Sequence, residues 1–186
     1  NAVMNILITG DRGFVGTATR TVLEEAGHSV HGYDLMDNKD IRDVQQLETV
    51  IVTTVPDRIL HLAAIARFSE ADTNPLLAYE TNVIGTKNVA QVAGKYHVPI
   101  VYASTGSVYM PIEEEPPIKE TGIIRGNSVY GCTEEGIKQR VWQVRMDSES
   151  RQIMGRTGVA QGTEKPFVAF EDGYGREICA SRQRKW

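Results

Sequence analysis

Long apolar segments, abundant cysteine and an excess of positive charge are all missing from this chain of 186 residues. Without a run of about 18 apolar residues a membrane-spanning helix is excluded. Without a charged and then apolar opening, a secretory leader is not expected. The two cysteines, Cys132 and Cys179, are too few for a zinc knuckle or a disulfide framework. The net charge of −4 argues against nucleic acid. We therefore expect a cytoplasmic protein with no membrane or nucleic-acid partner and, because its four histidines are scattered, no metal site.

Short apolar runs rich in β-branched residues alternate with segments of helical periodicity. Strands are expected over residues 3–9, 29–34, 58–63 and 99–104, and helices over 14–26, 44–52, 75–96 and 128–148. This alternation, with short connections, predicts a parallel sheet covered by helices on both faces. The fold class is therefore α/β, a doubly wound sheet of the Rossmann type, whose ligands bind at the carboxyl ends of the strands.

Three glycines in the sequence TGDRGFVG, residues 9–16, separate the first expected strand from the first helix. A glycine at position 10 permits a tight turn, and one at position 13 lets the backbone approach a pyrophosphate. The helix start that follows, with Phe14, Val15 and Gly16, offers free N–H groups and a partial positive charge to that anion. The spacing differs from the commoner G-x-G-x-x-G, and a plain tight turn is the alternative interpretation.

An acidic residue, Asp34, ends the second expected strand, eighteen residues after Gly16. A carboxylate at this place can accept hydrogen bonds from both hydroxyls of an adenosine ribose, and it repels a 2′-phosphate. The pattern therefore favours NAD over NADP. The alternative is that Asp34 only caps a helix or turn.

Further motifs follow in a fixed order along residues 3–133. They are Asp40-Ile41, His61-Leu62-Ala63-Ala64, Asn82 in NVIGTKN, the segment STGSVY at 104–109, and Tyr130-Gly131. Together with the glycine motif they resemble the extended short-chain dehydrogenases, which include the NAD-dependent nucleotide-sugar epimerases and dehydratases.

The resemblance implies a role for each motif. By it, Asp40 and Ile41 contact the adenine, residues 62–64 run beneath the cofactor, and Asn82 lies near it. Thr105 and Tyr130 match the catalytic Ser/Thr and Tyr of the family, and Tyr130 also lies at the cofactor. Each segment has a plainer interpretation as a buried strand, a helix residue that forms hydrogen bonds, a strand-end turn or a helix-start aromatic.

The chain departs from the family at the Lys of the Tyr-x-x-x-Lys motif, because the segment here is YGCTE and position 134 is Glu134. A free tyrosine has a pKa of about 10 and needs nearby positive charge to act as a base. A carboxylate acts in the opposite direction. Lys138 lies about 12 Å further along a helix, too far to replace the missing lysine directly. Cofactor binding can survive, since Glu134 can accept hydrogen bonds from the nicotinamide ribose.

The end of the chain is the second departure. We expect an NAD-binding domain over residues 1–148 and a divergent segment over 149–186, in which only 166–170 resembles a strand, so that the substrate domain is reduced or absent. Two functions stay open: chemistry of the oxidoreductase type on the hydroxyl of a nucleotide sugar, or a non-catalytic NAD-binding or sensing domain. The helices over 75–96 and 128–148 correspond to a dimer interface in the family, where Val83 and Val89 pack either on a partner or on the chain's own sheet.

Overall fold

The computed structural model describes residues 2–105, 128–133, 153–159, 166–171 and 177–179. The role of Glu134 and most of the helix expected over 128–148 lie outside the described residues. Of that helix, the structure describes a helical turn at residues 129–133.

A seven-stranded sheet forms the centre of the described part, in the order β2-β1-β3-β4-β5-β6-β7. The first five strands in this order are parallel to one another, and β6 pairs antiparallel with both β5 and β7. The strands are β1 (Asn5–Thr9), β2 (Ser29–Tyr33), β3 (Arg58–His61), β4 (Ile100–Ser104), β5 (Ile153–Val159), β6 (Pro166–Glu171) and β7 (Glu177–Cys179).

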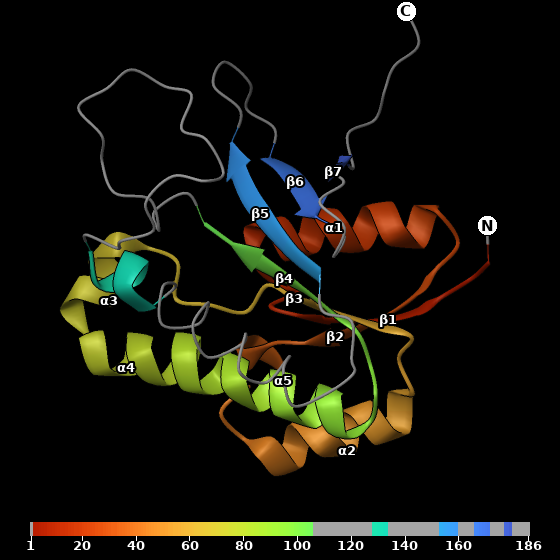
Figure 1. The fold of residues 1–186 in the computed structure, drawn as a ribbon, viewed down its shortest axis with the longest axis horizontal. Coiled ribbons are helices and arrows are strands. Elements are labelled where there is room, and N and C mark those ends of the chain that lie inside the picture. The colour runs from red at the N-terminus through yellow and green to blue at the C-terminus, as the bar shows by residue number, and fades with distance from the viewer. Residues whose placement is uncertain (1, 106–127, 134–152, 160–165, 172–176, 180–186) are drawn as a thin grey trace, which may run out of the picture.

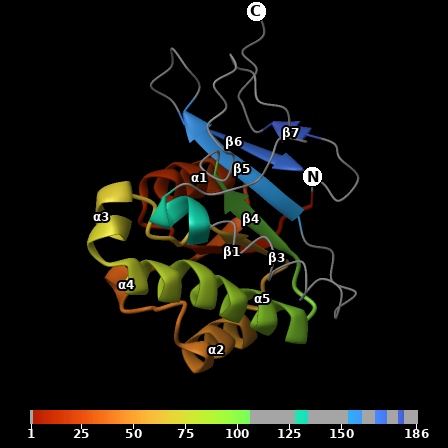
Figure 2. The same ribbon diagram turned by 60° about the vertical axis from the view of Figure 1, so that its left-hand side comes forward.

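Helices cover both faces of this sheet, as Figures 1 and 2 show, with α1 (Phe14–Glu25) on one side and α2 (Val44–Thr54) and α5 (Thr86–Lys95) on the other. The alternation of side chains along β1 explains the two layers. Leu7 belongs to the larger core, with Leu47 and Val89 from the helices. Ile6 and Ile8 point to the opposite face and pack with Leu23 of α1. The doubly wound α/β fold is thus confirmed.

The long helix expected over 75–96 is present but is not regular. It consists of α4 (Pro75–Tyr79), a π-helical turn η2 (Glu80–Gly85) and α5. A π-helical turn inserts one residue into the helical repeat, so side chains after it face a different direction. Val83 and Val89 are 2% and 1% exposed and belong to the chain's own core. These two valines are therefore unavailable to a partner, and the homodimer stays a prediction.

Several elements were not expected from the sequence. The short helices α3 (Phe68–Thr73) and η1 (Leu35–Asp37) have too few residues to show a period. β5 and β7 also went unpredicted, and β5 contains Gly155 and Gly158, which lower strand propensity. Pairing with β4 and β6 on both sides outweighs that local preference. Among the described residues, no helix is both long and apolar enough to span a membrane.

Candidate functional site

The carboxyl ends of β1, β2 and β3 form a switch point in the sheet. From β1 the chain first adds β2 on one side and later β3 on the other, which opens a crevice where these strands end. Gly10, Asp34 and Leu62 each follow directly after one of these strands. Three sequence-predicted site residues therefore meet at one edge of the sheet.

The glycine loop packs too closely for side chains at two of its positions. Gly10 has φ +75°, and a Cβ there would lie 2.7 Å from the Ala63 nitrogen. A Cβ at Gly16 would lie 2.1 Å from the Gly10 carbonyl oxygen. These contacts hold α1 and the segment after β3 against the loop, which is the close packing that the motif predicts.

Gly13 differs from its neighbours, because its outer side is open. A Cβ there would meet only the Gly10 carbonyl oxygen, at 3.2 Å. Gly13 is also the N-cap of α1, and no side chain caps this helix. The amides of the first turn, at Phe14, Val15 and Gly16, therefore present the positive end of the helix dipole toward the crevice, as an anion site requires.

Asp34 is held at the mouth of the crevice by two main-chain amides. Its Oδ2 accepts a hydrogen bond from the Arg12 amide at 3.0 Å, and its Oδ1 accepts one from the Met36 amide at 2.9 Å. Asp34 therefore does cap the turn η1, as the plainer interpretation expected. Each carboxylate oxygen can still accept another hydrogen bond, so the cap orients the group without excluding a ribose.

One cavity of about 330 Å³ brings most of the predicted cofactor residues together. Those that line it are Gly10, Gly13, Asp34, Asp40, Ile41, Leu62, Ala63 and Ala64. Much of the remaining wall is formed by Leu35, Lys39, Arg42 and Thr81. The cavity thus joins the anion site at the glycine loop to the carboxylate of Asp34.

Asp40 contributes charge to this wall. Its Oδ2 accepts a hydrogen bond from Arg42 Nη2 at 2.6 Å, and this bond lowers the pKa of the Asp40 carboxyl, while burial acts in the opposite direction. The hydroxyl of Tyr33 donates to the Asp40 carbonyl oxygen at 2.8 Å. Desolvation by burial raises the pKa of Tyr33, so this phenol stays neutral as a structural donor.

Asn82 lies beneath the site, with no exposed surface. Its Oδ1 accepts from the Ile65 amide at 2.8 Å, and its Nδ2 donates to the Ile65 carbonyl at 3.1 Å and to Thr133 Oγ1 at 3.1 Å. These bonds use both amide protons of Asn82. The residue links the loop after β3 to the helical turn at 129–133, and its contact with a cofactor stays a prediction.

The two candidate catalytic residues lie around the same edge. Thr105 follows the carboxyl end of β4. Tyr130 belongs to the helical turn at 129–133, which Figure 1 shows beside α3. Its ring meets that of Phe68 edge-on, with 5.8 Å between the ring centres. Thr133 Oγ1 donates to the Tyr130 carbonyl at 2.8 Å, so the bond from Asn82 to Thr133 also fixes this turn.

A buried polar chain supports the floor of the crevice. His61 is 1% exposed, and its Nδ1 lies 2.5 Å from Thr9 Oγ1. Its Nε2 lies 2.8 Å from Thr86 Oγ1. One ring nitrogen donates and the other accepts, so the neutral ring satisfies both partners. Burial lowers the pKa of His61 to about 4.

This histidine makes the protein less stable in acid. The folded-state pKa of His61 lies below its ordinary value, so the unfolded chain binds more protons between pH 6.5 and 4. Stability from His61 is complete above pH 6.5 and is lost as the pH falls toward 4. We expect a loss of about 2 kcal/mol between pH 7.5 and pH 5, measured by urea unfolding. His61→Gln removes the titration and should show a flatter pH dependence; parallel curves for both proteins would contradict the assignment.

Sequence reasoning missed several residues that build the site. Phe68 and Thr133 were not singled out, because only their contacts with Tyr130 and Asn82 reveal a role. Arg12 lies inside the glycine motif, where a basic residue between two of the glycines is a signal visible in the sequence. Among the described residues, no group of three or more His, Cys, Asp or Glu side chains could hold a metal ion.

Two features meet at the switch point of this parallel sheet: a strand–glycine loop–helix unit and an acidic residue that directly follows the next strand. Together they define a dinucleotide-binding α/β protein. The model of the NAD dependent epimerase/dehydratase family matches residues 6–171. The chain belongs to this family, whose cofactor is NAD. The predictions of an extended short-chain dehydrogenase, of the Rossmann-type fold and of NAD are thereby confirmed.

Similar proteins agree with this assignment. UDP-glucose 4-epimerase of Halalkalibacterium halodurans is 35% identical over 155 residues, which cover 73% of this chain and 45% of that protein. UDP-glucose 4-epimerase 2 of Arabidopsis thaliana is 29% identical over 202 residues, covering 92% and 56%. The Thermotoga maritima UDP-glucose 4-epimerase, solved with UDP-glucose, has a TM-score of 0.76 at 25% identity, covering 80% and 53%. The chain thus spans about half the length of these relatives.

Proposed function

We propose that this chain binds NAD in the crevice at the ends of β1 and β3 and serves the oxidation of a hydroxyl on a nucleotide sugar. The observation that carries the proposal is a cavity lined by both the glycine loop and Asp34. NAD contains a pyrophosphate joined to an adenosine ribose. The cavity has an anion site for the first and a carboxylate that can accept hydrogen bonds from the hydroxyls of the second. The relatives named as UDP-glucose 4-epimerases point to a UDP-sugar as the second ligand.

The cofactor residues have separate tasks in this proposal. The amides of Phe14, Val15 and Gly16 hold the pyrophosphate, and Asp34 accepts the ribose hydroxyls. Asp40 and Ile41 border the adenine. Residues 62–64 form the floor, which Thr9 supports from below through its contact with the Ala63 amide at 3.4 Å.

The reaction itself needs a base and a hydrogen-bond donor at the sugar hydroxyl. When bound, NAD supplies an acceptor for the hydride that leaves the sugar carbon. Tyr130 takes the hydroxyl proton, and Thr105 donates a hydrogen bond to the reacting oxygen. Glu134 accepts hydrogen bonds from the nicotinamide ribose. Because Glu134 supplies no positive charge to Tyr130, we expect slow turnover rather than lost binding.

Calorimetric titration with NAD tests the binding half of the proposal. We expect saturable heat in the micromolar to millimolar range, and a loss of at least about tenfold in affinity for Asp34→Ala, since charge-assisted hydrogen bonds to the ribose disappear. Thr53→Ala, an exposed helix position on α2, is the matched control and should bind as the native chain does. Absence of heat at millimolar NAD would contradict the proposal.

A further inference from the structure

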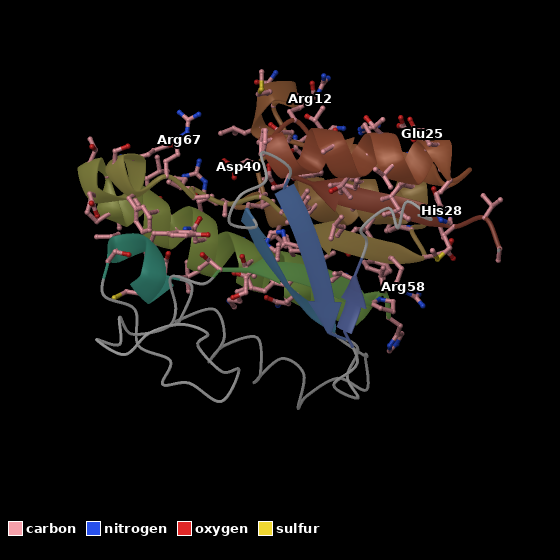
Figure 3. All side chains as sticks on the ribbon, turned by 90° about the horizontal axis from the view of Figure 1, so that it is seen from above. Arg12, Glu25, His28, Asp40, Arg58 and Arg67 are labelled. Carbon is pink, nitrogen blue, oxygen red and sulfur yellow. The ribbon has the colours of Figure 1, made fainter. Side chains whose placement is uncertain are left out.

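Arg12 lies directly beside the carboxylate that is to hold the ribose. Its amide donates to Asp34 Oδ2 at 3.0 Å, and its side chain projects outward at the amino end of α1, as Figure 3 shows. Figure 3 also labels Asp40, which lines the cavity, and His28 and Arg58, which lie at the opposite end of the sheet. A guanidinium in this place is the group that binds a 2′-phosphate in NADP-dependent proteins.

Asp37 forms an ion pair with this guanidinium. Arg12 Nε lies 3.2 Å from Asp37 Oδ2, and Arg12 Nη2 lies 3.0 Å from Asp37 Oδ1, so the two groups form a two-point pair. Asp37 is the last residue of η1, three residues after Asp34, and its amide donates to the Asp34 carbonyl at 2.9 Å. The turn that orients Asp34 therefore also places the partner of Arg12.

Among the described residues, the two cations that line the cavity are engaged as well. Lys39 Nζ donates to the Gly32 carbonyl at 2.9 Å, and Arg42 pairs with Asp40. Lys39 and Arg42 thus already have acceptors on neighbouring backbone or side chains. Arg12 adjoins Asp34, and its pairing with Asp37 determines whether the Arg12 guanidinium can bind another anion.

The pair between Arg12 and Asp37 contributes little to stability. The two side chains are 56% and 37% exposed, and ion pairs with this exposure add about 0–1 kcal/mol. Neutralising Asp37 should consequently leave the fold intact. The charge of Asp37 instead affects the binding of a phosphate dianion beside the ribose. That dianion competes with Asp37 for the guanidinium of Arg12.

We propose that Asp37 determines cofactor specificity by holding the guanidinium of Arg12 away from a 2′-phosphate. The inference rests on the proposed placement of the adenosine ribose at Asp34. Asp34 rejects the 2′-phosphate directly, and Asp37 adds to the rejection by removing the cation that would offset it. NADP is thus excluded by two carboxylates of one turn.

A double-mutant cycle tests this inference with the affinities for NAD and NADP as readout. Asp37→Asn should raise NADP affinity about tenfold, since the guanidinium of Arg12 is released to bind the 2′-phosphate. NAD affinity should change by less than about twofold. Arg12→Met in the native background should lower the NADP/NAD ratio, because the Asp37 carboxylate then faces the 2′-phosphate without its partner. Asp37→Asn combined with Arg12→Met should lose the gain.

The salt dependence provides a second readout. The gain in NADP affinity for Asp37→Asn should shrink as ionic strength rises, as expected for an exposed charge contact. An unchanged NADP/NAD ratio in Asp37→Asn, or a gain that persists when Arg12 is methionine, would overturn the inference. If the native chain binds NAD and the ratio does not move, this inference alone fails; if the native chain binds no NAD, the proposed function fails with it.

Discussion

Replacing Glu134 with lysine is expected to raise the rate at which a UDP-sugar reduces bound NAD by about a hundredfold or more. Positioned general base catalysis contributes about 10²–10⁴-fold. A tyrosine with the ordinary pKa of about 10 is largely protonated near neutral pH and is a weak base there. The lysine restores the charge that favours the phenolate of Tyr130 and turns a carboxylate that opposes it into a cation. Stopped-flow measurement of NADH absorbance with UDP-glucose records the change.

Two further variants show whether the gain in rate comes from the positive charge of the lysine and requires Tyr130. Glu134→Gln removes the negative charge without adding a positive one, so it should give only a fraction of the gain. Tyr130→Phe in the Glu134→Lys background should abolish the gain, because the proton acceptor is gone. A chain that binds NAD normally yet shows no added reduction after Glu134→Lys would favour the non-catalytic NAD-binding or sensing function.

The sequence predicts the parts of the site that depend on neighbouring residues. The glycine loop and Asp34 could be located because each belongs to a local strand end, where backbone geometry and residue type are linked within a few positions. The cavity contains both, together with the segment after β3. Motif order also singled out Asp40 and Ile41, which line the cavity, and their contact with adenine stays a prediction.

Contacts between distant segments could not be predicted in this way. The bond between Asn82 and Thr133 spans 51 residues, and the pair of Arg12 with Asp37 spans 25. Both depend on how a π-helical turn or a short 3₁₀ turn directs a side chain, and neither turn has a period that a sequence shows. The amide of Asn82 joins two supporting segments, a contact that the motif does not reveal, and its place near the cofactor stays a prediction.

Pairing in the sheet explains the remaining difference. The glycines of β5 argue against a strand when that segment is considered alone. Its neighbours on both sides, β4 and β6, supply the hydrogen bonds that outweigh the propensity. The family model extends to residue 171 and so includes β5 and β6, although the resemblance visible in the motifs ends near residue 133.

Substituting alanine at Gly13 is expected to separate NAD binding from folding. Gly13 has φ −70° and ψ 171°, a conformation that alanine adopts readily, and the added Cβ meets only one carbonyl oxygen at 3.2 Å. We expect stability to fall by about 1 kcal/mol or less, the usual cost of alanine at an N-cap. NAD affinity should fall by at least about tenfold, because the methyl group occupies the space through which the pyrophosphate reaches the amides of α1.

Gly16→Ala is the matched variant in the same loop, and its main effect should fall on stability. Its Cβ would lie 2.1 Å from the Gly10 oxygen and 2.7 Å from the Asp11 Cα, so the backbone itself must move. We expect a loss of stability of about 3 kcal/mol, the upper end for overpacking. Urea unfolding together with calorimetric NAD titration distinguishes the two. If Gly13→Ala binds NAD as tightly as the native chain, the pyrophosphate does not lie against this loop, and the crevice at the ends of β1 and β3 is not the cofactor site.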